Sequence, residues 1–383
     1  MLKRTYLLSS IALIALPAAA HAQEAPQPAD DAAGNEIVVT GTAGGGGSRQ
    51  AAAFAITSIS ADAIEQAAPN STADLLKVVP GVMAESSGGQ NGANIFVRGY
   101  PSGGDAEFVT LTTQGVPFFS PPTLSFLENT QLIRIDETIA RVEAVRGGTG
   151  ALFANGQPGL TVNFVQKEGG PEFEGLVKAS VTDFGDVRGD LRLSGPLGDN
   201  TTFMVGGYYS SGHGIRNPGF TAEKGGQITA NIRHDLDKGS ILVFARYLND
   251  HGQWLLPIPV IRDGDKVRQF GNIDPGTGVI AGPETRLSVL PDGTRADLGD
   301  GRGAKLINLG TNFDYEIGDG LQLRYRASYL KGDADTTGLV PASTAMSAAD
   351  YAASLGSTIG SLTYVNGGDA VANAGSQQVI RAG

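Results

Sequence analysis

The sequence predicts an α+β domain followed by an antiparallel transmembrane β-barrel, of which about seven strands are present. Three observations predict this fold. Mixed helix and strand signals fill residues 51–168, seven later runs alternate apolar and polar residues, and the connections between those runs are short at one end and mostly long at the other. The 55 glycines and 41% hydrophobic residues would also suit a disordered chain, but disordered chains lack such alternating runs.

The first 22 residues have the pattern of a secretory signal peptide. Lys3 and Arg4 precede an apolar run from Tyr6 to Leu16, and Ala20-His21-Ala22 forms a small-x-small cleavage site. The alternative, a transmembrane helix, needs at least about 18 apolar residues, and this run is shorter. We therefore expect export and cleavage after Ala22.

Composition excludes several kinds of site. The chain has 0 cysteines, which excludes disulfides and thiolate metal sites, and its net charge of -11 argues against a nucleic-acid partner. The four histidines, which are His21, His213, His234 and His251, have no metal-ligand spacing. The residue pattern contains no catalytic constellation, so we expect neither an enzyme nor a bound cofactor.

Residues 23–50 read as a flexible segment around one short strand. The compositions QEAPQPADDAAGNE (23–36) and AGGGGSRQ (43–50) are typical of linkers. Between them, the stretch NEIVVTGT carries β-branched residues with nothing nearby to pack on. We expect this strand to pair with another protein; the alternative is a first strand of the following domain.

The α+β domain is expected over residues 51–168. Ser60 is a candidate N-cap for a helix over 61–67, and Ser71-Thr72-Ala73-Asp74 has the capping-box pattern before a helix that Pro80-Gly81 ends. Strands are expected at 95–98, 108–113, 142–145 and 161–166.

Residues 173–383 carry the alternating runs of the expected barrel. The runs are 175–181, 188–194, 203–209, 227–233, 241–247, 307–314 and 321–329. Short turns at 196–200, 235–239 and 316–320 alternate with long connections at 210–226, 251–303 and from 331 onward. Alternation alone would also fit a soluble sandwich. The unequal connections, the tyrosines near strand ends and the arginines on the inward parity favour the barrel; those arginines are Arg188, Arg192, Arg246, Arg324 and Arg326.

Several motifs in order resemble the TonB-dependent outer-membrane receptors, in particular the siderophore receptors. Ile37-Val38-Val39-Thr40-Gly41 resembles the TonB box. The stretches 74–82, 96–99, 139–147 and 162–167 resemble the signatures of the plug domain, and Gln114-Gly115-Val116-Pro117 stands where the family usually has Asp-Gly-Val-Pro. The resemblance implies a plug inside an outer-membrane barrel of about 22 strands, in contact with membrane lipid, of which this chain would be the N-terminal portion.

The resemblance also implies roles for particular residues. Ile37, Val38, Val39, Thr40 and Gly41 would bind TonB, the energising partner at the inner membrane, by strand addition. Tyr100, Phe118, Phe119 and Phe126 are candidate ligand contacts, with packing against the barrel wall as the alternative. Arg98, Arg141, Glu143 and Arg146 are candidates for ion pairs between plug and barrel, with a solvated plug surface as the alternative.

The expected function is TonB-dependent import of a scarce solute, with a ferric siderophore as the first candidate. Alternatives are an importer of glycans or aromatic compounds, a passive porin or adhesin, and a nonfunctional truncated receptor. The last alternative arises because seven strands do not close a wide barrel and Gly383 falls in what reads as an external loop.

Overall fold

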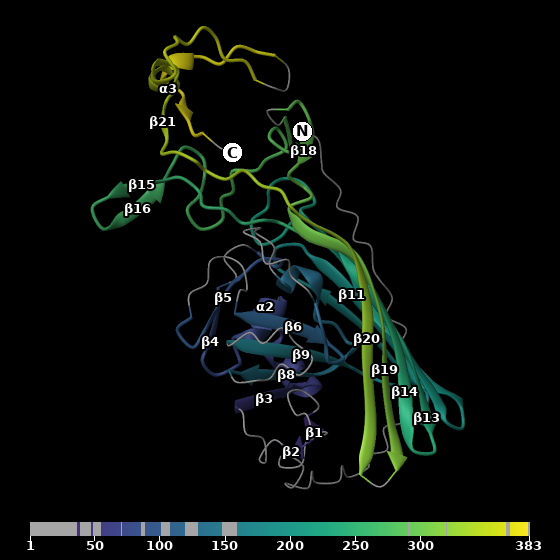
Figure 1. Ribbon diagram of the computed structural model, residues 1–383. Helices are drawn as coiled ribbons and strands as arrows, with labels where there is room; N and C mark the ends of the chain where they lie inside the picture. Colours follow the sequence, from purple (N-terminus) through teal and green to yellow (C-terminus); the bar gives the residue numbers. More distant parts are fainter. Residues whose placement is uncertain are drawn as a thin grey trace, which may run out of the picture.

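The computed structural model describes residues 37–38, 47–48, 55–69, 71–85, 89–100, 108–118, 129–147, 159–289, 292–318, 320–364 and 368–381. They form an N-terminal domain, a large curved sheet beside it, and a group of small elements beyond one end of that sheet (Figure 1).

The N-terminal domain is built on a five-stranded mixed sheet. In spatial order its strands are β3 (Ala55–Ser60), β8 (Ile139–Arg146), β9 (Leu160–Gln166), β6 (Val109–Thr113) and β7 (Val116–Pro117). Only the β6–β9 pair is parallel. A separate hairpin pairs β4 (Val82–Glu85) with β5 (Asn94–Val97), and the helical elements are α1 (Ala61–Ala67), α2 (Thr72–Leu76) and the 3-10 turn η2 (Asn129–Leu132).

The two helices begin at the serines that the sequence indicates. The Ser60 side chain accepts a hydrogen bond from the Ala63 amide at 3.3 Å, and the Ser71 side chain accepts one from the Asp74 amide at 3.0 Å. Each bond satisfies a donor that the first turn of a helix leaves free. The predicted helix over 61–67 is therefore confirmed.

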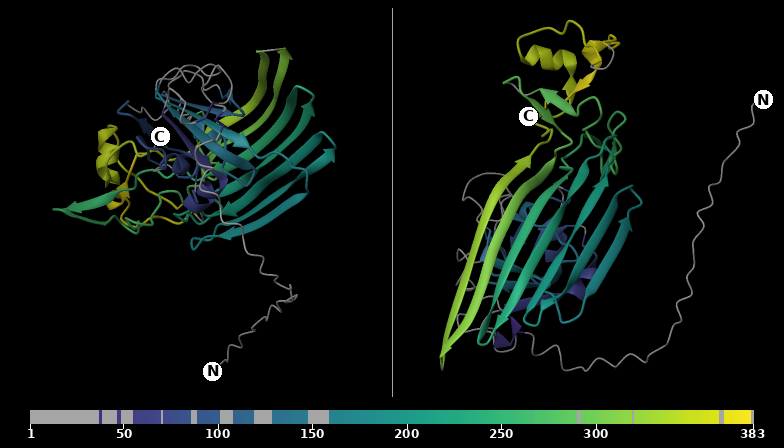
Figure 2. Two further views of the ribbon diagram at one scale, coloured as in Figure 1. Left: turned by 90° about the horizontal axis from the view of Figure 1, so that it is seen from below. Right: turned by 90° about the vertical axis from the view of Figure 1, so that its right-hand side faces the viewer.

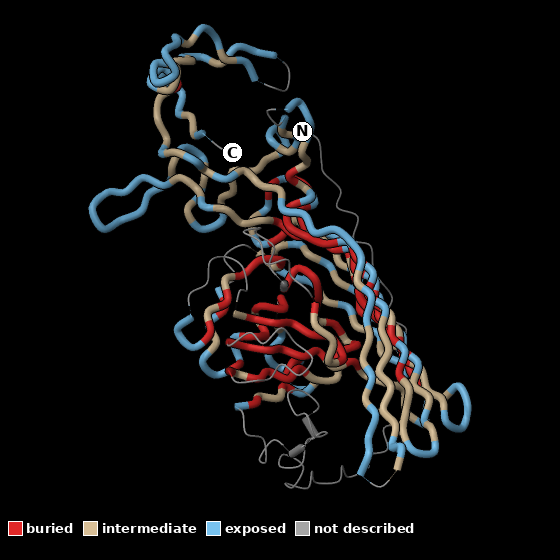
Figure 3. Tube along the Cα trace, in the orientation of Figure 1, coloured by how far each residue is buried: buried red, intermediate tan, exposed pale blue. Residues whose placement is uncertain are grey.

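An apolar core fills the N-terminal domain. Leu75, Leu76, Leu111, Leu160 and Phe164 are all fully buried and belong to one cluster between the helices and the sheet. Figure 3 shows this domain as the most continuously buried part of the molecule. Leu248, Ala304 and Leu306 of the large sheet also belong to this cluster, so the core extends to the contact with that sheet.

The large sheet contains seven antiparallel strands, as the seven alternating runs predict. In chain order and in spatial order they are β10 (Glu174–Val181), β11 (Val187–Gly198), β12 (Thr201–Gly212), β13 (Glu223–Leu236), β14 (Gly239–Gly252), β19 (Arg302–Gly318) and β20 (Leu321–Thr336). The sheet curves around one side of the N-terminal domain, and its strands run tilted side by side (Figure 2). Short connections lie at one end, between β11 and β12 at residues 199–200, between β13 and β14 at 237–238, and between the end of β19 and the start of β20, where the sequence predicts them.

The strand register aligns apolar residues on the outer face of this sheet. Leu191 lies opposite Val177, Ile228 opposite Tyr247, and Tyr247 opposite Ile307, and all five side chains are exposed. The inner face, toward the N-terminal domain, carries buried polar side chains such as Gln227 and Arg246 together with buried apolar ones such as Phe244 and Leu248. An exposed apolar outer face is typical of a sheet that meets lipid.

The small elements lie beyond the long-loop end of the sheet (Figures 1 and 2). They are the hairpins β15 (Val260–Asp263) with β16 (Lys266–Gln269), β17 (Leu287–Val289) with β18 (Arg295–Asp297), and β21 (Met346–Ser347) with β22 (Gln378–Val379), together with α3 (Ala348–Ser354) and η3 (Ala374–Ser376). Among the described residues, no helix is both long enough and apolar enough to cross a membrane.

Candidate functional site at the interface of domain and sheet

One segment of the N-terminal domain, residues 129–138, lies against the inner face of the large sheet; we call it the docking segment. Seven of its side chains are buried, namely Thr130, Gln131, Leu132, Ile133, Arg134, Asp136 and Thr138. The Thr72 hydroxyl donates to the Ile133 carbonyl at 2.7 Å and so ties the segment to α2. Asp136 accepts a 2.9 Å bond from the Thr138 amide, which turns the chain into β8.

A buried ion pair joins the docking segment to the sheet. Arg134 Nε lies 2.6 Å from Asp250 Oδ2 on β14, and each side chain is 5% exposed. Arg134 Nη1 also donates to the Thr130 carbonyl at 2.8 Å, which fixes the orientation of the guanidinium. A charge-assisted bond at this depth is strong, but removal of either partner leaves a buried charge unpaired.

Gln227 on β13 contacts the same segment through its amide. Gln227 Oε1 accepts from the Arg134 amide at 3.2 Å, while Nε2 donates to the Arg134 carbonyl at 3.0 Å and to Asp136 Oδ2 at 2.9 Å. The side chain thus pairs with both polar groups of one main-chain residue, as a neighbouring strand would.

Two arginines of the sheet donate to carbonyls of the docking segment. Arg246 Nη1 lies 2.6 Å from the Leu132 carbonyl oxygen and 3.1 Å from Gln227 Oε1. Arg188 Nη2 donates to the Ile135 carbonyl at 3.0 Å while the guanidinium holds Asp190. Both arginines lie on the inward parity that the sequence predicts for a charged wall.

Further contacts extend the interface along the sheet. Asn231 donates to the Lys167 carbonyl at 2.9 Å and Asn312 to the Gln114 carbonyl at 3.0 Å. Arg233 pairs with Glu168 at 3.1 Å, and Lys178 with Glu137 at 2.8 Å. Many of the described polar bonds at the interface end on main-chain carbonyls, and Leu248, Ala304 and Leu306 of the sheet add apolar contacts to the core of the N-terminal domain.

Two adjacent acids of the docking segment have opposite pKa shifts. Burial raises the pKa of Asp136 above its ordinary value, although hydrogen bonds from Thr138 and Gln227 act in the other direction. Partial burial also opposes ionisation of Glu137, but the hydrogen bond and charge of Lys178 lower its pKa overall. Proton uptake at the two positions therefore affects docking in opposite ways.

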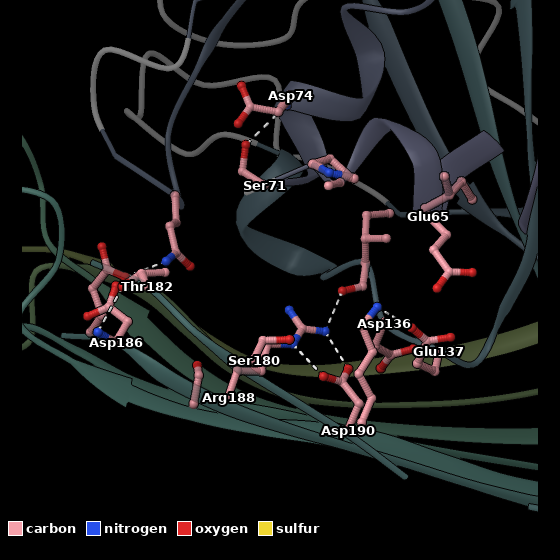
Figure 4. A pocket seen from close by; sticks show the side chains of 18 of the residues that line it. Glu65, Ser71, Asp74, Asp136, Glu137, Ser180, Thr182, Asp186, Arg188 and Asp190 are labelled. Carbon is pink, nitrogen blue, oxygen red and sulfur yellow. Dashed lines mark hydrogen bonds and ion pairs between the residues drawn. The ribbon is translucent and has the colours of Figure 1, made fainter. Parts of the chain in front are cut away.

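A cavity of about 500 Å³ lies between α1, α2 and strands β10 to β12. Figure 4 shows Arg188 reaching across it from the sheet toward Asp190 and the docking segment. Its charged lining residues are Glu65, Asp74, Asp136, Glu137, Lys167, Lys178, Asp186, Arg188, Asp190 and Glu223. Within the described residues, no three His, Cys, Asp or Glu side chains gather as a metal site.

Four residues are proposed for ion pairs between domain and sheet, and the structure gives bonds for three of them. Arg141 pairs with Glu143 at 2.8 Å, and Asn163 donates to Glu143 at 3.3 Å. Arg146 donates to the Pro80 carbonyl at 2.7 Å, and Arg98 lies in the turn after β5 with a φ of 52°. These bonds lie within the N-terminal domain, because β8 presents the side chains along its own sheet. The ion pairs to the large sheet described above involve Arg134, Glu137 and Glu168.

The aromatic candidates are placed in different surroundings. Tyr100 is 38% exposed and stacks on Phe108, with ring centroids 4.8 Å apart. Phe118 is buried in the core, and the Arg246 guanidinium carbon lies 5.0 Å from its ring centroid. Phe119 and Phe126 lie outside the described residues.

The strand-like stretch near the N-terminus is described in part. β1 (Ile37–Val38) pairs antiparallel with β2 (Gly47–Ser48), so its partner here is the glycine-rich linker. Val39, Thr40, Gly41 and the expected signal peptide lie outside the described residues.

The sequence pattern did not indicate a role at the interface for Arg134, Asp136 or Asp250. Gln227 falls in a predicted strand, 227–233, without an assigned contact. Asp250 also continues the inward parity of β14, and the alternation Leu132-Ile133-Arg134-Ile135-Asp136 precedes a recognised strand. Those two signals together could have indicated polar contacts between the docking segment and the inner face of the sheet, an interface that we call the seam.

Comparisons with known proteins agree with this architecture. The family model described as "TonB-dependent Receptor Plug Domain" matches residues 48–161. The pesticin receptor of Yersinia pestis is 30% identical over 192 residues, which are 49% of this chain and 26% of that protein. The ferripyoverdine receptor of Pseudomonas aeruginosa is 27% identical over 129 residues, which are 33% of this chain and 15% of that protein.

Solved structures share the fold. The ferripyoverdine receptor of P. aeruginosa in complex with a heterologous pyoverdine matches with a TM-score of 0.58 at 16% identity, over 82% of this chain and 38% of that one. The alcaligin outer-membrane receptor of Bordetella pertussis matches with a TM-score of 0.55 at 18% identity, over 78% and 42%. The chain thus spans less than half of each relative. Members of this family are outer-membrane transporters and not enzymes. The chain therefore carries a plug domain of the TonB-dependent receptor family over residues 48–161, followed by seven strands whose fold matches part of the barrel of such receptors.

Proposed function

We propose that this chain is the plug and the first barrel strands of an exported receptor that imports a ferric siderophore across the outer membrane with energy delivered by TonB. The observation that carries the proposal is the docking segment, which is buried yet held by hydrogen bonds and ion pairs. A plug of this kind is ordered at rest and can be displaced.

The chemistry of the interface supports displacement. A typical intramolecular hydrogen bond adds only about 0.5–1.5 kcal/mol net, because water replaces the lost partner when the contact opens. Polar groups that separate into a water-filled lumen are rehydrated, whereas an apolar seam would expose hydrocarbon to water. A pulling force therefore meets a smaller barrier at a polar seam.

The proposed handle is the TonB box, Ile37 to Gly41. Two residue pairs join β1 to β2, and one member of each pair is Gly47 or Ser48. Because this ladder is short and Gly47 and Ser48 have low strand propensity, β1 separates easily from β2. A strand of TonB can replace β2 and form a longer ladder with the β-branched residues of the box.

The proposed ligand region lies near Tyr100, with Phe118, Phe119 and Phe126. The exposed part of Tyr100 is available for contact with a bulky solute. The buried ring of Phe118 would support the region from beneath, since it lies against Arg246. A ferric siderophore as the solute is supported by relatives named as receptors for ferripyoverdine and alcaligin.

The test is energised uptake of radiolabelled ferric siderophores by cells that express the receptor with Val38→Pro. Proline removes a main-chain donor that strand addition needs, so uptake should fall to background while surface binding of the siderophore persists. Ala33→Pro, in the preceding linker, is the matched control and should leave uptake intact. Energised uptake at the unaltered rate in Val38→Pro would contradict the proposal.

A further inference from the structure

Three oxygen-bearing side chains converge on Gly214 at the long-loop end of the sheet. Asp186 lies in the loop between β10 and β11, Glu223 begins β13, and Gln253 follows β14. The Gly214 amide donates to Asp186 Oδ1 at 3.0 Å. A Cβ placed on Gly214 would lie 2.9 Å from Glu223 Oε1 and 3.2 Å from Gln253 Oε1. We call these three side chains the oxygen cluster.

The cluster holds buried polar atoms without partners. Gln253 is 6% exposed, and neither Oε1 nor Nε2 of its amide has a hydrogen-bond partner. Asp186 Oδ2 is buried and also lacks one. Buried polar atoms in folded proteins are nearly always paired, so the oxygens of this cluster point to a missing group.

The charges around the cluster favour a cation as that group. Glu223 is 8% exposed, its carboxyl group lies within hydrogen-bond reach of that of Asp186, and Asp186 and Asp250 act on it as like charges. The neighbouring cation, Arg134, already pairs with Asp250. The Gln90 amide nitrogen donates to Glu223 Oε2, which leaves Oε1 directed toward Gly214.

We propose that the oxygen cluster binds a divalent cation of the calcium class. Two carboxylates balance the charge of such an ion, and the Gln253 carbonyl supplies a neutral third oxygen. Calcium takes six to eight oxygen ligands in irregular geometry, so main-chain carbonyls and water complete the shell, whereas zinc and copper prefer nitrogen and sulfur ligands.

A bound ion would connect elements that are far apart in sequence. It would join the β10–β11 loop, the β12–β13 loop at Gly214, the start of β13 and the chain after β14. Through Gln90 it would also reach the plug. Asp186 and Glu223 line the cavity of about 500 Å³, and Figure 4 labels Asp186 at its edge. The site would therefore order the outer ends of the strands around the plug, independently of the import proposed above.

The chain provides its own reporter for a binding experiment. Trp254 is the single tryptophan and directly follows Gln253. Terbium, a luminescent substitute for calcium, should emit when Trp254 is excited in the refolded 383-residue chain in detergent micelles. We expect saturable emission that calcium displaces and magnesium does not.

Isosteric variants test the ligands. Glu223→Gln and Asp186→Asn should each weaken terbium binding by about tenfold or more, because affinity depends on ligand charge. Asp237→Asn, in the exposed turn at the opposite end of β13, is the control and should bind as the unaltered chain does. Circular dichroism of each variant establishes that the fold is retained.

Two outcomes would overturn the proposal. One is the absence of tryptophan-sensitised emission from the folded chain. The other is emission that Glu223→Gln and Asp186→Asn leave unchanged, which would mean that the carboxyl pair shares a proton instead of a metal ion. Neither outcome bears on siderophore uptake, which the Val38→Pro test addresses separately.

Discussion

The strands of the plug sheet and of the barrel sheet differ in which side chains they bury. In the plug, Leu111, Val162 and Phe164 are fully buried among other apolar side chains. In the barrel sheet, Val177 and Leu191 are exposed, whereas Gln227 and other polar side chains are buried. The plug therefore has an apolar core, to which Leu248, Ala304 and Leu306 of the sheet add, while the barrel sheet combines an exposed apolar outer face with an inner face against the plug.

This difference explains how one chain can contain a stable body and a releasable contact. Apolar burial contributes about 25 cal/mol per Å² and lies mostly inside the plug. The contact between plug and sheet combines polar bonds, which need exact partners and have small net free energies, with the apolar contacts of Leu248, Ala304 and Leu306. A force on the plug should therefore open the seam before it unfolds the plug.

The largest expected effect comes from breaking the buried ion pair. Arg134→Met leaves Asp250 buried without its partner, so the free energy of unfolding should fall by about 3–5 kcal/mol. Guanidinium unfolding of the refolded chain, followed by circular dichroism, measures it.

The matched control for that variant removes both charges. Arg134→Met combined with Asp250→Leu leaves no unpaired charge, so it should restore most of the lost stability. A double variant as unstable as the single one would mean that the pair is not the source of the effect.

A core truncation in the plug should cost slightly less. Leu111→Ala removes a fully buried side chain and should lower the free energy of unfolding by about 3 kcal/mol. Leu191→Ala, on the exposed outer face, should cost under about 1 kcal/mol in the same detergent. Equal losses at both positions would remove the contrast between the two sheets.

Local signals predicted a large part of this fold. Ser60 and Ser71 mark their helices because capping involves residues three apart, and the barrel strands follow from alternation along each run. The seam was not predictable in the same way. Arg134 and Asp250 are 116 positions apart, and only the curvature of the sheet around the plug brings them together. Arg141 and Glu143 carry a familiar motif, but β8 places their contact inside the plug.

A smaller effect is expected at Gln227. Gln227→Leu removes three hydrogen bonds to the docking segment and should lower stability by about 1–3 kcal/mol, since it leaves the main-chain groups of Arg134 unpaired. Gln322→Leu, on the exposed part of β20, is the control and should have little effect. Equal stability of the two variants would contradict a structural role for the Gln227 amide.

The smallest effects concern pH and have opposite signs at adjacent residues. The pKa of Asp136 is raised, so its contribution to stability is complete below the ordinary value of 3.8 and is lost as pH rises through the folded value. The pKa of Glu137 is lowered, so its contribution is present above 4.5 and is lost as pH falls through the folded value. Unfolding measurements across the acidic range test both residues. The difference in stability between the unaltered chain and Asp136→Asn should shrink as pH rises. The difference between the unaltered chain and Glu137→Gln should shrink as pH falls. Slopes of the same sign would contradict these assignments.

The central claim is that the seam is polar so that the plug can be released. The most direct measurement is energised siderophore uptake by the receptor carrying Arg134→Met with Asp250→Leu, compared with its stability. Apolar side chains can hold the seam as firmly, but they are not rehydrated when it opens. We therefore expect the double variant to retain its stability and its siderophore binding and to import the siderophore more slowly. Uptake at the unaltered rate in this stable variant would contradict the claim.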